Sequence, residues 1–324
     1  MVSFVEGLKG WVRDRVGVDF YLLVAHGKNY LGANVFAKLL AVLALPFFTR
    51  LIDPAGYGVI GVYNSIVSLL LVFMLAGMPG VFMRFFFDED RDFKGLVGAN
   101  LGFLLVLNSI LVVFAFIFRE SLAGFFEVST SVLLLALITC FCVVPFNLYL
   151  SILKAKKDSR RHSLIYTLNL SLITLLGLGL VFSMAEERYL GKIYGRVIIS
   201  VLFGLLALYY LLKSSKLSWN TGYLKESLAF GIPLIPTSLS VMVLSTFDHI
   251  MINQISGSIQ TGLYTIAYQV GLMVALFYSS LASIWVPMFY EHRKKKEYVL
   301  IEALTRQYMK IILLGALGLI FFSK

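Results

Sequence analysis

Long apolar runs alternate with short polar segments along the whole chain. Each run has about the 17 to 25 residues that an α-helix needs to cross a bilayer. We predict nine membrane-spanning helices, at residues 30–48, 57–83, 95–118, 131–153, 163–184, 193–212, 224–252, 262–288 and 308–322. Residues 1–28 form a separate cytoplasmic segment, whose apolar and basic positions recur at helical spacing and predict an amphipathic helix on the membrane surface.

The composition excludes a soluble protein. Apolar and aromatic residues make up 59% of the 324 residues, and Lys, Arg, Asp and Glu together make up 14%. A soluble domain carries about a quarter charged residues, so the charges present here could not cover a water-exposed surface. The fold class that fits is an all-α polytopic membrane protein.

The basic residues alternate between the two ends of the predicted helices. The amino-terminal tail and the loops after the second, fourth, sixth and eighth helices contain 4, 3, 5, 3 and 5 Lys or Arg residues, whereas the other loops contain 1, 1, 2 and 0. Because Lys and Arg accumulate on the cytoplasmic side of membrane proteins, this pattern predicts a cytoplasmic amino terminus. The net charge of +10 therefore records topology, and we expect no nucleic-acid partner.

Two prolines interrupt the seventh predicted helix. Pro233 and Pro236 each remove a backbone donor, and Gly231 precedes them. We expect a hinge or an unwound segment here, which would serve gating or ion coupling. Proline is also commoner in membrane helices than in soluble ones, so a purely structural bend is the alternative.

Two segments resemble the polysaccharide flippases of the Wzx type, which belong to the multidrug/oligosaccharidyl-lipid/polysaccharide (MOP) exporter superfamily. The first is NYLGANVFAKLLAVLALPFFTRLIDPAGYGVIGVYNSIVSLL at 29–70, with a Lys-Leu-Leu stretch, a Thr-Arg turn and a loop ending in Tyr-Gly. The second is FGIPLIPTSLSVMVLSTFDHIMINQISGSIQTGLYTIAYQVG at 230–271, with a proline-rich start and an Asp before an Ile-rich helix end. Trp285, Pro287 and Tyr290 are similar to the end of the family's eighth helix.

The resemblance implies two six-helix lobes that face each other across a central cavity. It assigns residues 29–213 to the first lobe and residues 214–324 to three helices of a second lobe, so the chain looks truncated beside a family with twelve or more helices. It also implies a transporter. Such a protein would move polyprenyl-diphosphate-linked oligosaccharide across the cytoplasmic membrane by alternating access, in polysaccharide biosynthesis. Membrane lipids and a coupling proton or sodium ion would be its other partners. We expect no enzyme, cofactor or metal, because the sequence shows no catalytic motif and no metal-ligand spacing.

Polar side chains inside the predicted helices are candidate substrate ligands, because a charge there costs about 2.5 to 3.5 kcal/mol on insertion scales. Cations in a central cavity would bind the diphosphate, and amide or phenol groups would bind sugars. The candidates are Lys38, Asn34, Arg84, Arg196, Asn64, Tyr264 and Tyr268. The alternatives are snorkelling for the lysine, lipid headgroup binding for the arginines and interhelical hydrogen bonds for the amides and phenols.

Asp248 lies inside the seventh predicted helix and is the candidate for ion coupling or gating, together with Pro233 and Pro236. Its partner is expected from another helix or from an ion, because no basic residue lies within one turn and His249 is expected to face about 100° away. A structural hydrogen bond to a neighbouring helix is the alternative.

Two other functions remain open: a cation-coupled drug exporter of the same superfamily, and a membrane enzyme acting on polyprenyl-linked sugars. The enzyme would need clustered carboxylates or histidines at one membrane face, which the sequence does not show.

Overall fold

The computed structural model describes residues 40–88, 92–156, 158–216 and 219–272, and a few residues between 297 and 309. Residues 33–266 form one compact unit, and residues 1–32 and 267–324 form the other. The predicted surface helix within residues 1–28 lies outside the described part, as does most of the span predicted at 308–322. The lobe boundary expected at residue 213 stays a prediction.

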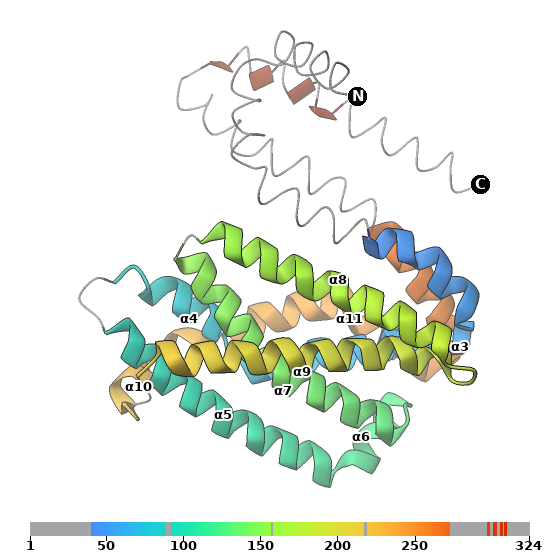
Figure 1. The fold of residues 1–324 in the computed structure, drawn as a ribbon, viewed down its shortest axis with the longest axis horizontal. Coiled ribbons are helices and arrows are strands. Elements are labelled where there is room, and N and C mark those ends of the chain that lie inside the picture. The colour runs from blue at the N-terminus through green and yellow to red at the C-terminus, as the bar shows by residue number, and fades with distance from the viewer. Residues whose placement is uncertain are drawn as a thin grey trace. The chain divides into compact units, whose positions relative to one another are not determined.

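The elements in the described part of the chain are helices, which confirms the all-α class (Figure 1). Six of them are long and apolar enough to cross a membrane and coincide with predicted spans two to seven: α3 (Pro54–Leu75), α5 (Phe93–Ile117), α7 (Thr130–Ala155), α8 (Ser159–Ser183), α9 (Arg188–Ser214) and α11 (Leu234–Ser256). Shorter helices are Leu40–Leu51, α4 (Met78–Phe85), α6 (Arg119–Phe126), α10 (Thr221–Gly231) and 258–272. The chain is therefore a multi-pass membrane protein, and the count of nine spans stays a prediction.

Polar caps decide where five of these helices begin. A side-chain oxygen accepts a hydrogen bond from a backbone N–H of the first turn in α3, α5, α7, α8 and α10; the capping residues are Asp53, Asp92, Ser129, Asp158 and Asn220. In α3 the next residue is Pro54. Proline lacks a backbone N–H, and this costs nothing here because the first N–H of a helix has no acceptor within the helix. The residues that follow each cap are mostly apolar and continue the helix.

Two of the predicted spans are broken, and the breaks touch each other. Ala76 and Gly77 separate α3 from α4 and adopt left-handed conformations, with φ of 46° and 71°. Ile232 and Pro233 separate α10 from α11. A Cβ atom on Gly77 would overlap the carbonyl oxygen of Gly231, so only glycine permits this approach. The interruption expected near Pro233 is present, whereas the break at Gly77, inside a span predicted as continuous, is a correction. We call these two interruptions the paired breaks.

The core lies around α3 and α7. The hydroxyl groups of Tyr63 on α3 and Thr139 on α7 lie 2.7 Å apart and share a buried hydrogen bond. The next residue of α7, Cys140, donates its thiol to the carbonyl oxygen of Val67, one turn further along α3, with a sulfur–oxygen distance of 3.6 Å. The two helices are therefore fixed to each other in the interior; α9 packs against both of them, and α11 packs against α3 (Figure 1).

A glycine seam joins α3 to helix 258–272 near the end of the unit where α3 begins. A Cβ atom on Gly58 would overlap the carbonyl oxygen of Ser258, and one on Gly262 would overlap the carbonyl oxygen of Pro54. Because no side chain separates the two helices here, their backbones lie in direct contact. We use the term glycine seam for Gly58, Gly262 and the two backbone groups that they meet.

The short helix α6, which the sequence pattern did not reveal, is held at its carboxyl end by α11. The amide nitrogen of Gln254 donates to the carbonyl oxygen of Phe125 at 2.6 Å, and that of Asn253 donates to the carbonyl oxygen of Phe126 at 3.2 Å. Carbonyl groups at the end of a helix have no partner within the helix. These two amides therefore cap α6 and tie it to the end of α11.

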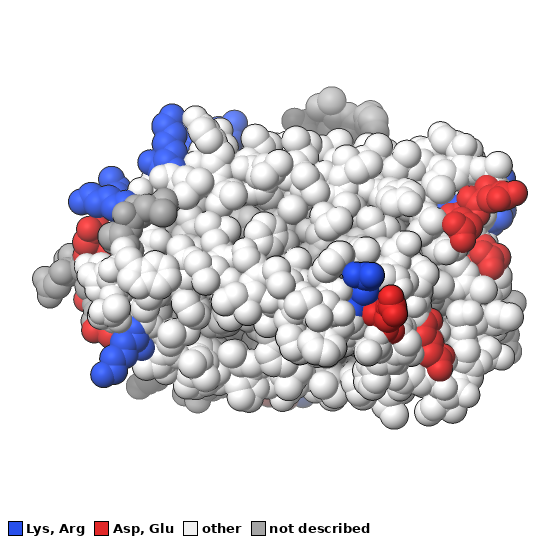
Figure 2. All heavy atoms as spheres, turned by 90° about the horizontal axis from the view of Figure 1, so that it is seen from below, with Lys and Arg blue, Asp and Glu red and all other residues white. Residues whose placement is uncertain are grey.

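Charged side chains gather toward the two ends of the unit and leave a broad uncharged middle (Figure 2). The end where α4 and α9 finish carries Arg84, Lys94, Lys154, Lys156, Arg160, Arg161, Lys213, Lys216 and Lys225. The end where α3 and α9 begin carries more acidic side chains: Asp53, Glu120, Glu127, Glu186 and Glu187. We call these the basic end and the acidic end.

Candidate functional site

Arg196 of α9 and Asn64 of α3, two residues singled out from the sequence, lie together inside the unit. A guanidinium nitrogen of Arg196 donates a short hydrogen bond to the side-chain oxygen of Asn64. The guanidinium carbon also lies 5.6 Å from the ring centre of Tyr63. Arg196 is the ninth residue of α9, about 12 Å along the helix from its start. An amide and an aromatic face thus hold a cation within a membrane-crossing segment.

A second cation, Lys192, occupies the same face of α9 one turn before Arg196. Its ammonium lies 4.4 Å from the ring centre of Phe48 and 4.9 Å from that of Tyr57. The sequence analysis counted Lys192 as a loop residue, because the sixth span was predicted to begin at residue 193. The observed helix begins at Arg188, so the spacing of four residues between two cations on an apolar helix was the signal that was missed.

No acidic side chain forms an ion pair with Lys192 or Arg196 among the residues that the structure describes. Both cations instead rest on aromatic rings, and one of them on an amide oxygen. Such contacts are weaker than an ion pair in a poorly solvated place. Neither cation is therefore neutralised by a carboxylate within the part of the chain that the structure describes.

Asp248 of α11 is bonded to Tyr264 of helix 258–272. The Tyr264 hydroxyl donates a short hydrogen bond to one carboxylate oxygen, and the other oxygen lies 2.9 Å from Nδ1 of His249. The expectation that His249 faces away from Asp248 is therefore wrong, because a histidine ring can turn back toward its preceding residue. Tyr264 was a candidate for sugar binding, with an interhelical hydrogen bond as the alternative. Its hydroxyl forms such a hydrogen bond, to Asp248.

One turn of α3 touches both groups. Asn64 faces Arg196, whereas Ser65 donates to the carbonyl oxygen of Thr246 on α11 at 2.8 Å. On the same side as Ser65, Gly61 lies against the His249 ring. A shift of this turn of α3 would therefore move the surroundings of the cations and of Asp248 together.

Arg84 lies apart from these groups, at the basic end. Its guanidinium carbon lies 4.5 Å from the ring centre of Phe230 on α10, and both residues line a cavity of about 310 Å³ together with Phe85, Glu226 and Ala229. A cation beside an aromatic face is suited to an anion linked to a sugar or to a lipid headgroup.

The remaining candidates are placed only in part. Lys38 and Asn34 lie outside the described residues, so their roles stay predictions. Tyr268 is described on helix 258–272 but belongs to the unit of residues 267–324, which is not placed relative to the sites above. Pro233 and Pro236 lie at the start of α11, beside the paired breaks. Among the described residues, no group of three His, Cys, Asp or Glu side chains could hold a metal ion.

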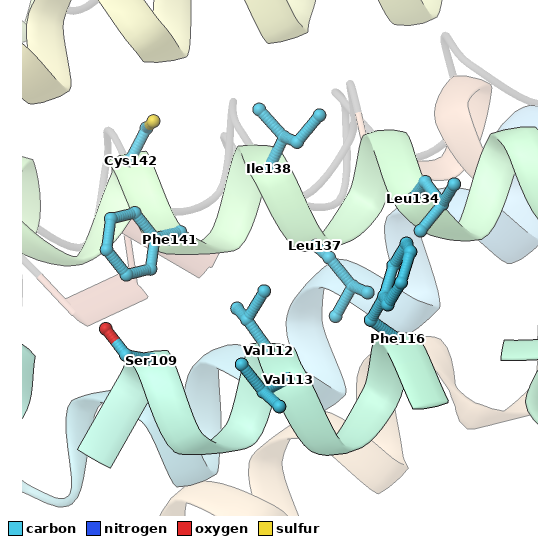
Figure 3. Close-up of a pocket in the computed structure, with 9 residues that line it drawn as sticks. All are labelled: Ser109, Val112, Val113, Phe116, Leu134, Leu137, Ile138, Phe141 and Cys142. Carbon is cyan, nitrogen blue, oxygen red and sulfur yellow. The ribbon is translucent and has the colours of Figure 1, made fainter. Parts of the chain in front are cut away.

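An apolar cavity of about 560 Å³ lies between α5 and α7 (Figure 3). Val112, Val113 and Phe116 line it from α5, and Leu137 and Phe141 are among the residues that line it from α7. The hydroxyl of Ser109 at its edge already donates to a carbonyl of its own helix at 2.8 Å. This lining suits hydrocarbon and not a charged or sugar headgroup.

A sequence model of the family described as "Polysaccharide biosynthesis protein" matches residues 27–292. The chain belongs to this family. Protein 1 of the Lsg locus of Haemophilus influenzae is 25% identical to it over 282 residues, which cover 83% of this chain and 66% of that protein. An uncharacterised membrane protein of the same organism is 20% identical over 282 residues, which cover 84% of this chain and 66% of that protein. The chain spans about two thirds of the length of both relatives.

Solved structures of multidrug resistance transporters share the fold of this polysaccharide biosynthesis protein. A transporter of the MATE family in its inward-facing conformation gives a TM-score of 0.63 at 16% identity, covering 88% of this chain and 69% of that one. A MATE family transporter in an outward-facing conformation gives a TM-score of 0.55 at 17% identity, covering 90% of this chain and 69% of that one. Both of those transporters belong to the MOP superfamily, and the likeness shows that this chain shares their fold. The match to the family model confirms the predicted resemblance to proteins of polysaccharide biosynthesis.

Proposed function

We propose that the protein is a flippase that moves polyprenyl-diphosphate-linked oligosaccharide across the cytoplasmic membrane by alternating access. The observation that carries the proposal is Arg196, a cation inside a membrane-crossing helix that is held by Asn64 and Tyr63 rather than by an acid. Family membership supports a role in polysaccharide synthesis, and the shared MOP fold supports transport.

In this proposal the basic end faces the cytoplasm, so the substrate meets Arg84 before it reaches Arg196. Arg196 lies about 12 Å along α9 from its start at the acidic end, whereas Arg84 lies on α4 at the basic end, beyond the break at Ala76 and Gly77. Two cationic positions separated in this way would hold the diphosphate near each membrane face in turn, while the polyprenyl tail stays in lipid.

The test is translocation of a fluorescent polyprenyl-diphosphate oligosaccharide in proteoliposomes. We expect Arg196→Gln to slow translocation about tenfold or more, because it removes a charge-assisted contact with the diphosphate. Arg196→Lys should retain part of the rate, since the charge remains but the forked geometry is lost. Lys213→Gln is the matched control, because Lys213 is a cation over an aromatic ring at the opposite end of α9. Equal rates for all variants and the unaltered chain would contradict the proposal.

The drug exporter is the second candidate, because the solved structures of similar fold are multidrug transporters and Asp248 offers a carboxylate. Lys192 and Arg196 would repel a cationic drug from the α9 side of the unit. Accumulation of a cationic dye in the same vesicles, unaffected by Arg196→Gln, would favour this second function. We expect no such accumulation.

A further inference from the structure

Two charges of opposite sign line one cavity at the basic end. The cavity has a volume of about 310 Å³ and lies between the short helices α4 and α10, with Arg84 and Phe85 on one side and Glu226, Ala229 and Phe230 on the other. Both charged residues are described by the structure, and no ion pair joins Arg84 to Glu226. A cavity that keeps a guanidinium and a carboxylate apart is suited to a ligand that carries both a negative and a positive charge.

The two charges lie at a similar depth. Arg84 follows the break at Gly77 and Glu226 precedes the break after Gly231, and these two glycines touch in the paired breaks. At 1.5 Å per residue, Arg84 is about 10 Å and Glu226 about 8 Å from this contact, both toward the basic end. Both side chains are exposed. At this end of a membrane-embedded unit, they meet the lipid headgroups rather than the hydrocarbon.

The inner wall of the cavity is aromatic. Phe230 lies one turn closer to the paired breaks than Glu226, and its ring meets that of Phe85 edge to face, with ring centres 6.4 Å apart. The guanidinium carbon of Arg84 lies over the Phe230 ring, 4.5 Å from its centre. A guanidinium that rests on a ring keeps the N–H donors at its edge for a phosphate. The cavity therefore presents charges in its outer part and apolar carbon in its inner part, which suits an amphiphile.

We propose that this cavity binds the headgroup of phosphatidylethanolamine, with Arg84 donating to the phosphate and Glu226 accepting from the ammonium. A choline headgroup has no N–H to donate, and a glycerol headgroup has no positive charge, so neither matches both sides of the cavity. The acyl chains would extend past Ala229 and Phe230 into the hydrocarbon. Arg84 is also the first cation that the proposed substrate meets, so lipid and substrate would compete for it, but the lipid site does not depend on transport.

The experiment compares three phospholipids that share their acyl chains: phosphatidylethanolamine, phosphatidylcholine and phosphatidylglycerol. The purified full chain is mixed with equal amounts of each, and native mass spectrometry counts the lipid molecules that stay bound. We expect phosphatidylethanolamine to bind about tenfold more tightly than the other two.

Two variants separate the two sides of the cavity. Arg84→Gln should weaken binding of phosphatidylethanolamine and of phosphatidylglycerol alike, about fivefold or more, because both have a phosphate. Glu226→Gln should weaken only phosphatidylethanolamine and leave phosphatidylglycerol equal or tighter, because the carboxylate no longer repels an anionic headgroup. Lys225→Gln is the matched control, since it changes a charge next to Glu226 that does not line the cavity. It should keep the preference of the unaltered chain.

A second measurement uses the unaltered chain and so does not depend on the folding of a variant. A ligand that binds only the folded chain raises its Tm. Short-chain phosphatidylethanolamine at about ten times its Kd should raise the Tm in detergent by about 2 to 4 °C. The matched choline and glycerol lipids should raise it by less than about 1 °C, as should glycerophosphoethanolamine, which has the same charges but no acyl chains.

Four results would overturn the inference. Equal binding of the three lipids would show that the cavity does not select a headgroup, and phosphatidylglycerol bound as tightly as phosphatidylethanolamine would show that Arg84 binds a phosphate without help from Glu226. A Tm shift as large with glycerophosphoethanolamine as with the lipid would assign the cavity to a soluble zwitterion. A loss of preference in Lys225→Gln equal to that in Glu226→Gln would make the effect one of general surface charge.

Discussion

Arg196 contacts one turn of α3 at Asn64, and Asp248 is connected to the same turn through His249, whose ring lies against Gly61. Both residues could be singled out from the sequence, because burying a charge in a membrane-crossing segment costs free energy and such charges usually have a functional role. Their partners could not be read from the sequence. Asn64 lies 132 residues from Arg196, and only packing shows which polar group faces which charge. Lys192 was missed for a more local reason, since the start of its helix was predicted five residues too late.

For Asp248, we expect the substitution Asp248→Asn to separate coupling from binding. The amide keeps the size of the side chain and can still accept from the Tyr264 hydroxyl, but it cannot release or bind a proton or hold a cation by charge. Transport driven by a proton or sodium gradient should fall about tenfold or more, whereas exchange of labelled for unlabelled substrate without a gradient should change less than about threefold. Both rates are measured in the same proteoliposomes. Loss of exchange together with gradient-driven transport would show that Asp248 contacts the substrate.

At the scale of elements, the apolar runs placed α5, α7, α8 and α9 within about five residues, because membrane-crossing helices must satisfy their own backbone hydrogen bonds. The runs that contain α3 and α11 also took in the separate helices α4 and α10. The break at Ala76 and Gly77 could not be placed in this way. Its cause is tertiary: the chain turns there because Gly77 meets the backbone of Gly231, more than 150 residues later in the sequence. Helix α6 escaped prediction because it is short and depends on caps from α11.

The paired breaks predict a difference between two glycine substitutions. Gly77→Ala should lower the free energy of unfolding by about 1 to 3 kcal/mol, because the residue has a positive φ and its Cβ would overlap the Gly231 carbonyl. Gly179→Ala on α8 is the matched control, since no atom lies within 4 Å of its Cβ position, and it should leave stability unchanged or slightly higher. Unfolding in detergent, followed by circular dichroism, measures both. Equal stability of the two variants would mean that the breaks are not in tight contact.

At the scale of the whole molecule, the broad uncharged middle and the two charged ends fit a protein embedded in a bilayer (Figure 2). The fold class could be predicted from the composition, and the polysaccharide biosynthesis family could be predicted from two segments of the sequence. The number of spans stays a prediction, because parts of the predicted spans lie outside the described residues. The lobe boundary at residue 213 also stays a prediction; it falls inside the compact unit of residues 33–266.

The asymmetry of charge predicts the orientation of the molecule. In a chain whose two native cysteines are replaced, Lys156→Cys at the basic end should react with a membrane-impermeant maleimide only after the cells are permeabilised. Glu186→Cys at the acidic end should react about equally before and after permeabilisation. Mass shift of the purified protein measures both. The reverse pattern would place the basic end outside the cell.

The glycine seam bears on the leakage of ions through a transporter. Side-chain gates can admit water when a rotamer changes or when a titratable group gains or loses a proton. At Gly58 and Gly262 the contact consists of backbone against backbone, so it contains no rotamer to flip and no group to titrate, and it can part only when whole helices move. In the transporter proposed above, such a contact would let a cell hold many copies of the protein without dissipating its membrane potential, because the closed seam would not depend on a side-chain gate.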